Sequence, residues 1–269
     1  MESNKILIED LETGNLDDLI YVCSSKKLND PVHRQGIALK KTWLEEVMSH
    51  FGPVAKIAYF QGKPVAQITF LPEEADPTKP NAREGVIQIK CIYNSAQQAR
   101  SLGIATKLLE RLIEECRKGR VCNIPAPCRF LVTEPFNTGE GQSLSQFFAK
   151  KGFKESQNEP RIMYLSITAP YEPLGSARHY APLCEDEGKA IIFYNPTCEF
   201  SFPFATGIVE SLADVAPRLA IELINEWERP EESIRRNYDK VIVNSKPIKT
   251  FFMDKVEFRK EVEAALTNP

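Results

Sequence analysis

The chain has 269 residues, of which 42% are hydrophobic and 26% are charged, and its formal net charge is −3. This length is comfortable for two hydrophobic cores, and the composition is typical of a globular protein. The slightly negative charge gives no general basic field for nucleic acid or an anionic membrane, and no apolar run approaches the ~18 residues that span a bilayer. We therefore expect neither nucleic acid nor a membrane as a partner.

The cysteines indicate a reducing compartment. Seven of them, at positions 23, 91, 116, 122, 128, 184 and 198, form an odd set without the spacing of a disulfide framework. The first residues, MESNKILIEDLE, are acidic and begin like a strand rather than like a signal peptide. We expect reduced thiols and a cytoplasmic protein. Cys122 and Cys128 have no second cysteine pair or histidine nearby to complete the four ligands of zinc, so no metal is expected.

The first part of the chain alternates strand and helix patterns. Hydrophobic periodicity predicts a strand over 5–11, a helix beginning near Asn15, a second helix over 38–51, and a hairpin of 55–60 with 64–71 around Gln61-Gly62-Lys63. The polar, proline-rich residues 72–83 are predicted to form a loop.

The central stretch joins a buried strand to a long amphipathic helix. Residues 86–93 are β-branched and apolar, and apolar residues from Ile104 onwards recur at helical spacing as far as Lys118. Gly103 stands at the tight turn between the two elements. The first amides of a helix have no partner within it and its dipole favours negative charge there, so this junction predicts an anion site. Gly103 permits close approach of a ligand, and Arg100 adds a charged clamp. The alternative is an ordinary strand–turn–helix unit whose glycine serves packing only.

The elements that follow complete this half of the chain. A strand is predicted over 129–133, a helix over 143–151, and a strand pair after Gly152-Phe153 that ends at 161–167.

The sequence Arg100-x-x-Gly103-x-Ala105 resembles the Arg/Gln-x-x-Gly-x-Gly/Ala acyl-CoA-binding motif of the GNAT superfamily of N-acyltransferases. The element order over the first 167 residues and the segment FFAKKGF at 147–153 are also similar to that family. The resemblance implies an α/β (α+β) fold with a mixed central sheet flanked by helices. It also implies an N-acetyltransferase that uses acetyl-CoA as co-substrate and a small-molecule or peptide amine as acceptor.

The resemblance assigns roles to residues of this sequence. It implies that the pyrophosphate of coenzyme A lies on the backbone of Arg100, Ser101, Leu102, Gly103, Ile104, Ala105 and Thr106, that Ile92 and Tyr93 lie along the pantetheine arm, and that Asn137 lies beside the cofactor. Glu134 is a candidate base for the amine, or equally a structural carboxylate. Members of the family often carry a tyrosine four residues before the final glycine, as the acid that reprotonates the CoA thiolate. Phe148 stands there and has no proton to donate, which leaves Tyr164 as a replacement acid or as a core aromatic.

The second part of the chain has its own series of elements. Residues 169–188 are predicted to form a linker, followed by a strand over 189–194, a helix that reaches Leu212, a strand within 218–227, a helix over 230–236, a hairpin of 240–243 with 249–253, and a helix from Asp254 to Leu266. The predicted domains are therefore 1–168 and 189–269, joined by the linker 169–188.

This series, with Cys198-x-x-Ser201 at a helix start, resembles the thioredoxin/glutaredoxin fold and, behind a GNAT-like part, the YoaP-like domain of two-part acetyltransferases. A helix N-terminus lowers the pKa of a thiol, so Cys198 is a candidate nucleophile. Ser201 replaces a resolving cysteine, which permits monothiol chemistry only. Asp239 stands where these folds carry a cis-proline, and its carboxylate opposes a thiolate. The alternative is an inert cysteine in a scaffold that binds substrate or a second subunit.

Three functions follow from these patterns. The first is an acyl-CoA-dependent N-acetyltransferase whose thioredoxin-like C-terminal domain shapes the acceptor site. The second is a thiol-redox or thiol-carrier protein that uses Cys198, with the GNAT-like half as a CoA-binding module. The third, suggested by Phe148, is a module that senses CoA without catalysis.

Overall fold

The computed structural model describes residues 6–96, 102–136, 143–175, 179–238 and 240–267. The chain divides into two compact units. Residues 1–26 and 44–177 form the first unit, and residues 27–43 with 178–269 form the second. The predicted division at 168 and 189 stays a prediction, and the structure adds an early segment, 27–43, to the C-terminal unit.

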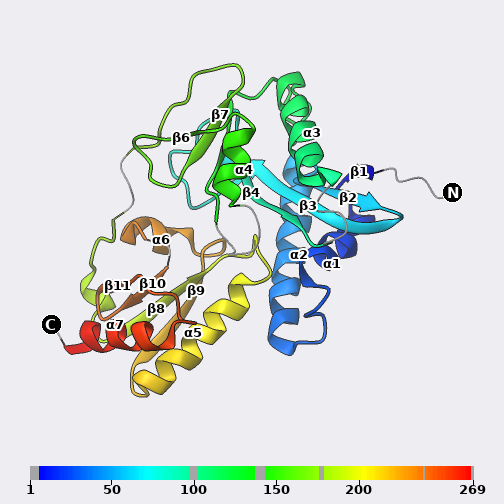
Figure 1. Cartoon of the computed structure of the whole chain (residues 1–269). Helices are drawn as coiled ribbons and strands as arrows, with labels where there is room; N and C mark the ends of the chain where they lie inside the picture. The colour runs from blue at the N-terminus through cyan, green and yellow to red at the C-terminus, as the bar shows by residue number, and fades with distance from the viewer. Residues whose placement is uncertain (1–5, 97–101, 137–142, 176–178, 239, 268–269) are drawn as a thin grey trace. The chain divides into compact units, whose positions relative to one another are not determined.

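The first unit contains a mixed sheet (Figure 1). Its strands, in spatial order, are β1 (Ile6–Asp10), β2 (Ala55–Phe60), β3 (Lys63–Pro72), β4 (Val86–Asn94), β5 (Phe130–Thr133), β7 (Met163–Ser166) and β6 (Lys154–Glu155). Neighbouring strands run antiparallel, except that β4 and β5 run parallel. The predicted fold class, a mixed sheet with helices against it, is confirmed.

Helix α3 (Ile104–Lys118) is the crossover that the parallel pairing of β4 and β5 requires. Its buried residues are those that the periodicity predicts: Ile104, Leu108, Leu109, Leu112, Ile113 and Cys116. The helix packs against β2, β3 and β4, and it ends at Gly119, whose φ of 62° lies in the left-handed region. The other helices assigned to this unit alone are α1 (Leu16–Ser24) and α4 (Leu144–Lys150), with short 3-10 turns η1 (Thr13–Asn15) and η2 (Glu73–Ala75).

Helix α2 (Pro31–Phe51) begins seven residues before the predicted start at residue 38. The Asp30 carboxylate accepts hydrogen bonds from the amides of Val32 and His33, both at 3.0 Å, and Pro31 occupies the first helical position. Aspartate at the N-cap followed by proline is a helix-start signal, so the sequence contained the information needed for the correct boundary.

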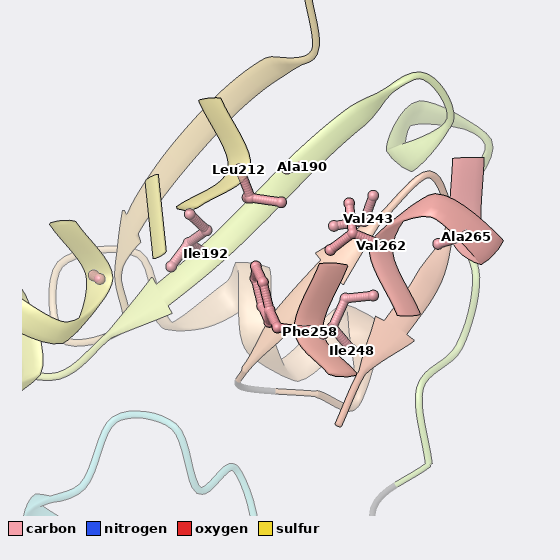
Figure 2. Close-up of a cluster of buried hydrophobic side chains, with 9 residues drawn as sticks. Ala190, Ile192, Leu212, Val243, Ile248, Phe258, Val262 and Ala265 are labelled. Carbon is pink, nitrogen blue, oxygen red and sulfur yellow. The ribbon is translucent and has the colours of Figure 1, made fainter. Parts of the chain in front are cut away.

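The second unit contains a four-stranded sheet. Its spatial order is β11 (Lys246–Ile248), β10 (Val241–Val243), β8 (Lys189–Tyr194) and β9 (Ala220–Asn225), and only β8 and β9 run parallel. Its helices are α5 (Ser201–Val215), α6 (Pro230–Arg236) and α7 (Lys255–Thr267), after the 3-10 turn η4 (Cys184–Asp186). Figure 2 shows the core, in which Phe258 and Val262 of α7 meet Ile192 of β8 and Val243 of β10.

The predicted second arm of the last hairpin, 249–253, is wrong. Strand β11 is Lys246–Ile248, and the turn before it is Asn244-Ser245, whose φ angles of 47° and 58° are both positive. Two positive φ values in a two-residue turn match the right-handed twist of the strands. Pro247 lies within β11, where it is tolerated because β11 is an edge strand with one side free of ladder hydrogen bonds.

Candidate functional site

Strands β4 and β5 separate at a defined point. Their parallel register runs from Val86 opposite Phe130 to Ile89 opposite Thr133, where β5 ends. The Thr133 hydroxyl donates a hydrogen bond to the Ile89 carbonyl at 3.2 Å, which closes this last rung. Strand β4 continues to Asn94, and no described strand pairs with that side of it beyond Ile89. Among the described residues this side of β4 is therefore a strand edge beyond Ile89, and a ligand that carries amides of its own is able to lie along such an edge.

A β-bulge lies at the same point, on the opposite side of β4. Thr69 of β3 is opposite Cys91, and Phe70 is opposite Ile89, so Lys90 is the extra residue. A bulge bends its strand and increases the local twist. The sequence patterns did not predict this bulge, because a bulge is a relation between the registers of two strands and leaves no periodic signal in one of them.

The start of α3 has the features of an anion site. Gly103 is the N-cap with φ 66° and ψ 24°, a left-handed conformation that favours glycine. No side chain of the described residues caps the helix start, and the first turn contains no acidic residue. A Cβ built on Gly103 would meet no described atom within 4 Å. The positive end of the helix dipole is thus not neutralised by a described side chain.

The other residues predicted to bind coenzyme A are placed as follows. Leu102 is exposed, Ile104 is buried, and Ala105 and Thr106 are half-buried in the first turn of α3. Ile92 and Tyr93 lie on the open part of β4, opposite Ile68 and Gln67 of β3. Arg100, Ser101 and Asn137 lie outside the described residues. The structure brings the described members together at the β4–α3 junction, and their predicted roles stay predictions.

The two acid–base candidates of this unit each have a partner. Glu134 forms an ion pair with Arg161 at 2.9 Å, and both side chains are exposed. Tyr164 stacks on Tyr171, with ring centroids 4.1 Å apart and planes within 6°. Both contacts fit the structural alternatives for these residues as well as the catalytic ones.

Gln88 is a candidate that no sequence pattern indicated. It is opposite Val132, which is in turn opposite Tyr164, so the three side chains share one face of the sheet. The Gln88 Oε1 atom is buried and has no hydrogen-bond partner among the described residues. A buried acceptor without a partner is costly, and it marks a position where a ligand N–H group is able to bind.

A buried charge network occupies the predicted loop 72–83. The Glu73 carboxylate pairs with Arg83 at 2.7 Å and with Lys79 at 2.9 Å, and the Asp76 carboxylate pairs with Lys90 at 2.8 Å. Burial by itself raises the pKa of Glu73 and Asp76, but the hydrogen bonds and charges of their basic partners outweigh it and hold both pKa values at about 2. The segment is a loop, as predicted, with the short 3-10 turn η2, and its buried ion pairs form a clamp between the end of β3 and Lys90 of β4.

This network predicts acid sensitivity of the first unit. The folded pKa values of Glu73 and Asp76 lie below their ordinary 4.5 and 3.8, so their stabilisation is complete above pH 4.5 and is lost as the pH falls towards 2. We expect the urea midpoint, followed by circular dichroism, to fall over this range, and Asp76→Asn to flatten the fall. Glu74→Gln, at the exposed neighbouring carboxyl, is the control that leaves the slope unchanged. An unchanged slope in Asp76→Asn would contradict this account.

The predicted thiol site lies in the second unit, just before α5. The Ser201 hydroxyl accepts a hydrogen bond from the Asn195 amide at 2.9 Å, and the Ser201 amide donates to the Cys198 carbonyl at 3.0 Å. The next residue, Glu199, is buried and pairs with Lys40 of α2 at 2.7 Å. Two further residues of the segment 27–43 pack on this turn. The ring centroid of His33 lies 4.5 Å from that of Phe200, and Gly36 lies so close to the Glu199 carbonyl oxygen that a Cβ there would clash with it.

The predicted lowering of the Cys198 pKa is wrong. Although the residue is exposed, the protein atoms around its thiol limit hydration and raise its pKa, and the Glu199 carboxylate raises it further. The Lys40 ammonium and the amides at the start of α5 act in the opposite direction but do not outweigh these effects. A helix start lowers the pKa of a thiol through its dipole, but at Cys198 the adjacent buried Glu199 carboxylate opposes that effect. Asp239, whose carboxylate was expected to oppose a thiolate, lies outside the described residues.

Alkylation of Cys198 tests this result. The rate of its reaction with iodoacetamide, followed by peptide mass spectrometry, is expected to rise with a midpoint above the pH of about 8.5 that is typical of a free cysteine. Glu199→Gln is expected to lower that midpoint, because it removes the negative charge beside the thiol. A midpoint near neutrality in the unmodified chain would restore the thiol-redox interpretation.

Neither a metal-binding cluster nor a membrane-spanning helix is present in the described part of the chain. No group of three or more histidine, cysteine, aspartate or glutamate side chains is arranged there to hold a metal ion. No described helix combines the length and the apolar character that crossing a membrane requires.

Known proteins were compared with the chain by sequence and by structure. No family model and no curated protein matches the sequence. A GNAT family acetyltransferase from Brucella melitensis, solved in complex with acetyl-CoA, matches with a TM-score of 0.43 and 13% identity over 65% of this chain and 95% of that one. An N-acetyltransferase from Staphylococcus aureus Mu50 matches with a TM-score of 0.44 and 20% identity over 61% and 99% of the two chains. PaiA N-acetyltransferase from Thermoplasma acidophilum, solved with coenzyme A, matches with a TM-score of 0.42 and 16% identity over 60% and 99%. These are similarities of fold.

Proposed function

We propose that the first unit is an acyl-CoA-dependent N-acyltransferase that moves an acetyl group from acetyl-CoA to the amine of a small molecule or peptide. One observation carries the proposal: β4 separates from β5 at Ile89, and the chain then leads to the start of α3, which no described side chain caps. An open strand edge followed by a helix N-terminus suits a ligand that combines an amide-containing arm with a diphosphate.

The cofactor has two parts that match this arrangement. The diphosphate of acetyl-CoA would accept hydrogen bonds from the amides at the start of α3, where no described atom lies within 4 Å of a Cβ built on Gly103. The pantetheine arm, which contains two amide groups, would lie along Lys90–Asn94 and take the place of a missing strand. No metal ion is part of the proposal, because a thioester is already activated towards amines.

The reaction requires one bond to form and one to break. The amine nitrogen attacks the thioester carbonyl carbon, backbone donors of β4 stabilise the oxyanion, and the C–S bond then breaks to release the CoA thiolate. The Gln88 Oε1 atom would accept a hydrogen bond from the amine and orient it. Glu134, through water, would take the proton that the amine loses, and Tyr164 would supply a proton to the thiolate.

The second unit is proposed to be a thioredoxin-like, YoaP-like domain that shapes the acceptor site. The order β8-α5-β9-α6-β10-β11-α7, with β8 and β9 parallel, supports this proposal. The raised pKa of Cys198 argues against its use as a thiolate carrier. None of the seven cysteines, all of which lie in the described part of the chain, is in a disulfide, and this fits a reducing compartment such as the cytoplasm.

The test is turnover by the full chain. Acetyl-CoA is incubated with a panel of spermidine, lysine, kanamycin and a peptide with a free N-terminus, and acetylated products are identified by mass spectrometry. Thiol reagents are avoided, because the exposed Cys184 and Cys198 would react with them. Several turnovers per enzyme support the proposal and exclude a CoA-sensing module. Tight binding of CoA without turnover would favour that module, and absence of CoA binding would contradict the proposed function.

A further inference from the structure

Lys90 occupies a junction between three strands. It is the extra residue of the β4 bulge opposite β3, and it is also the first residue of β4 beyond the last rung with β5. Cys91, Ile92 and Tyr93 stay paired with β3 but have no partner on β5, so the bulge at Lys90 marks the point where β4 diverges from β5 and not from the sheet. Contacts that hold the Lys90 side chain therefore act directly before the peptide groups of Cys91, Ile92 and Tyr93.

The side chain of Lys90 is fixed by Asp76. Its Nζ atom lies 2.8 Å from Asp76 Oδ2, and the side chains of Lys90 and Asp76 are only 16% and 3% exposed. The other oxygen, Asp76 Oδ1, accepts hydrogen bonds from the Thr78 amide at 3.1 Å and the Thr78 hydroxyl at 2.7 Å. Both oxygens of the Asp76 carboxylate thus accept hydrogen bonds, and the two bonds from Thr78 orient the carboxylate independently of Lys90.

Asp76 itself lies in a segment that several buried hydrogen bonds and ion pairs hold. It follows η2, where the buried Glu73 carboxylate binds Arg83 through two oxygens and also binds Lys79. The Asp76 amide donates to the Glu73 carbonyl at 3.1 Å, and the Lys79 amide donates to the Asp76 carbonyl at 3.1 Å. The clamp therefore connects the end of β3 to the bulge of β4 through hydrogen-bonded, buried groups.

A buried ion pair is a poor way to stabilise a strand, because an apolar pair of similar volume does so equally well or better. An ion pair does specify one geometry, because either charge is costly to bury unless its partner lies within hydrogen-bond distance. We propose that the Asp76–Lys90 pair is a positioning device that sets the angle at which β4 leaves β5, and so aligns the amides of residues 91–93 with the pantetheine arm and the thioester oxygen. This inference rests on the proposed function.

The test compares two lysines of the same clamp. Lys90→Met removes the cation at the bulge. Lys79→Met is the control, because the Lys79 side chain is also 16% exposed but pairs with Glu73 and does not belong to the bulge. Hydrogen exchange measures the amides of β4, and calorimetry measures the dissociation constant of CoA, both on the full chain. We expect Lys90→Met to speed exchange at residues 91–94 at least tenfold and to weaken CoA binding at least tenfold. Lys79→Met is expected to change either quantity less than twofold, and Lys90→Arg to restore both to within about threefold of the unmodified chain.

The outcomes separate this inference from the proposed function. Exchange and affinity that stay within twofold in Lys90→Met overturn the inference, as do equal changes in both methionine variants. If the unmodified chain binds no CoA, the proposed function fails, while faster exchange confined to Lys90→Met still supports the positioning of the strand. Should Lys90→Met fail to fold, Asp76→Glu keeps the charges, moves the carboxylate by one methylene, and is expected to give the same pattern at smaller amplitude.

Discussion

Lys40→Met is expected to destabilise the second unit by about 3–5 kcal/mol, the usual cost of removing one partner from a buried ion pair. The Lys40 ammonium lies 2.7 Å from the Glu199 carboxylate, and the two side chains are 3% and 1% exposed. Without this cation the Glu199 carboxylate stays buried, and the Lys40 charge no longer offsets the free energy that is lost when the carboxylate is removed from water. A loss of this size is a large share of the roughly 5–15 kcal/mol that stabilises a typical domain.

Tryptophan fluorescence during urea unfolding measures the stability of the second unit specifically. The chain has two tryptophans, Trp43 and Trp227, and both belong to the second unit, with ring centroids 5.6 Å apart in an edge-to-face arrangement. Lys260→Met is the matched control, because Lys260 also lies 2.7 Å from its partner Glu257 but both side chains are more than half exposed. The control is expected to change stability by less than about 1 kcal/mol. Equal losses in Lys40→Met and Lys260→Met would contradict the account.

The same pair has a consequence for fragments. A fragment of residues 178–269 lacks Lys40, His33 and Gly36, which the structure packs against the Glu199–Phe200 turn. Truncation near residue 170 therefore removes three buried residues of the second unit from the C-terminal piece, and the full chain is the form in which function has to be measured.

Thr106→Glu is expected to weaken CoA binding at least tenfold, or by about 1.4 kcal/mol, relative to Thr106→Gln. Thr106 lies in the first turn of α3, where no acidic residue is present. A carboxylate there repels a diphosphate, whereas the amide of the same size does not. The same carboxylate interacts favourably with the helix dipole by about 0.3–1 kcal/mol, so the folded protein becomes no less stable.

The experiment is specific because Thr106→Glu is expected to weaken CoA binding without lowering the stability of the folded protein. Calorimetry gives the dissociation constants of CoA, and urea unfolding followed by circular dichroism gives the stabilities. Weaker binding together with equal or greater stability in Thr106→Glu is the expected result. Equal dissociation constants for the two variants would place the diphosphate elsewhere.

Much of the fold was predictable because it depends on local periodicity. The buried face of α3 was predicted from apolar residues at helical spacing, and β4 from its run of β-branched residues. The start of α2 was missed although Asp30-Pro31 signals it, because the hydrophobic pattern becomes regular only near residue 38. The last hairpin was misplaced because Pro247 was interpreted as a turn residue, whereas its tolerance depends on β11 being an edge strand.

The site was less predictable, because its decisive contacts are between residues distant in sequence. Lys40 and Glu199 are 159 positions apart, and nothing in either local sequence predicts their pairing. The bulge at Lys90 depends on the register of β3 against β4. The pKa of Cys198 depends on the neighbouring Glu199 carboxylate and on hydration of the thiol, neither of which a helix-start motif contains. The glycine turn was predicted because it needs only a local conformation.

The most direct test of the central claim is an amide nitrogen–proton spectrum of the full chain during titration with CoA. We expect the amide signals of Gly103, Ile104, Ala105 and Thr106 to shift together with those of residues 90–94, and all of these shifts to saturate at the same CoA concentration. Amides at the start of α3 that stay unshifted when CoA has saturated the protein would contradict it.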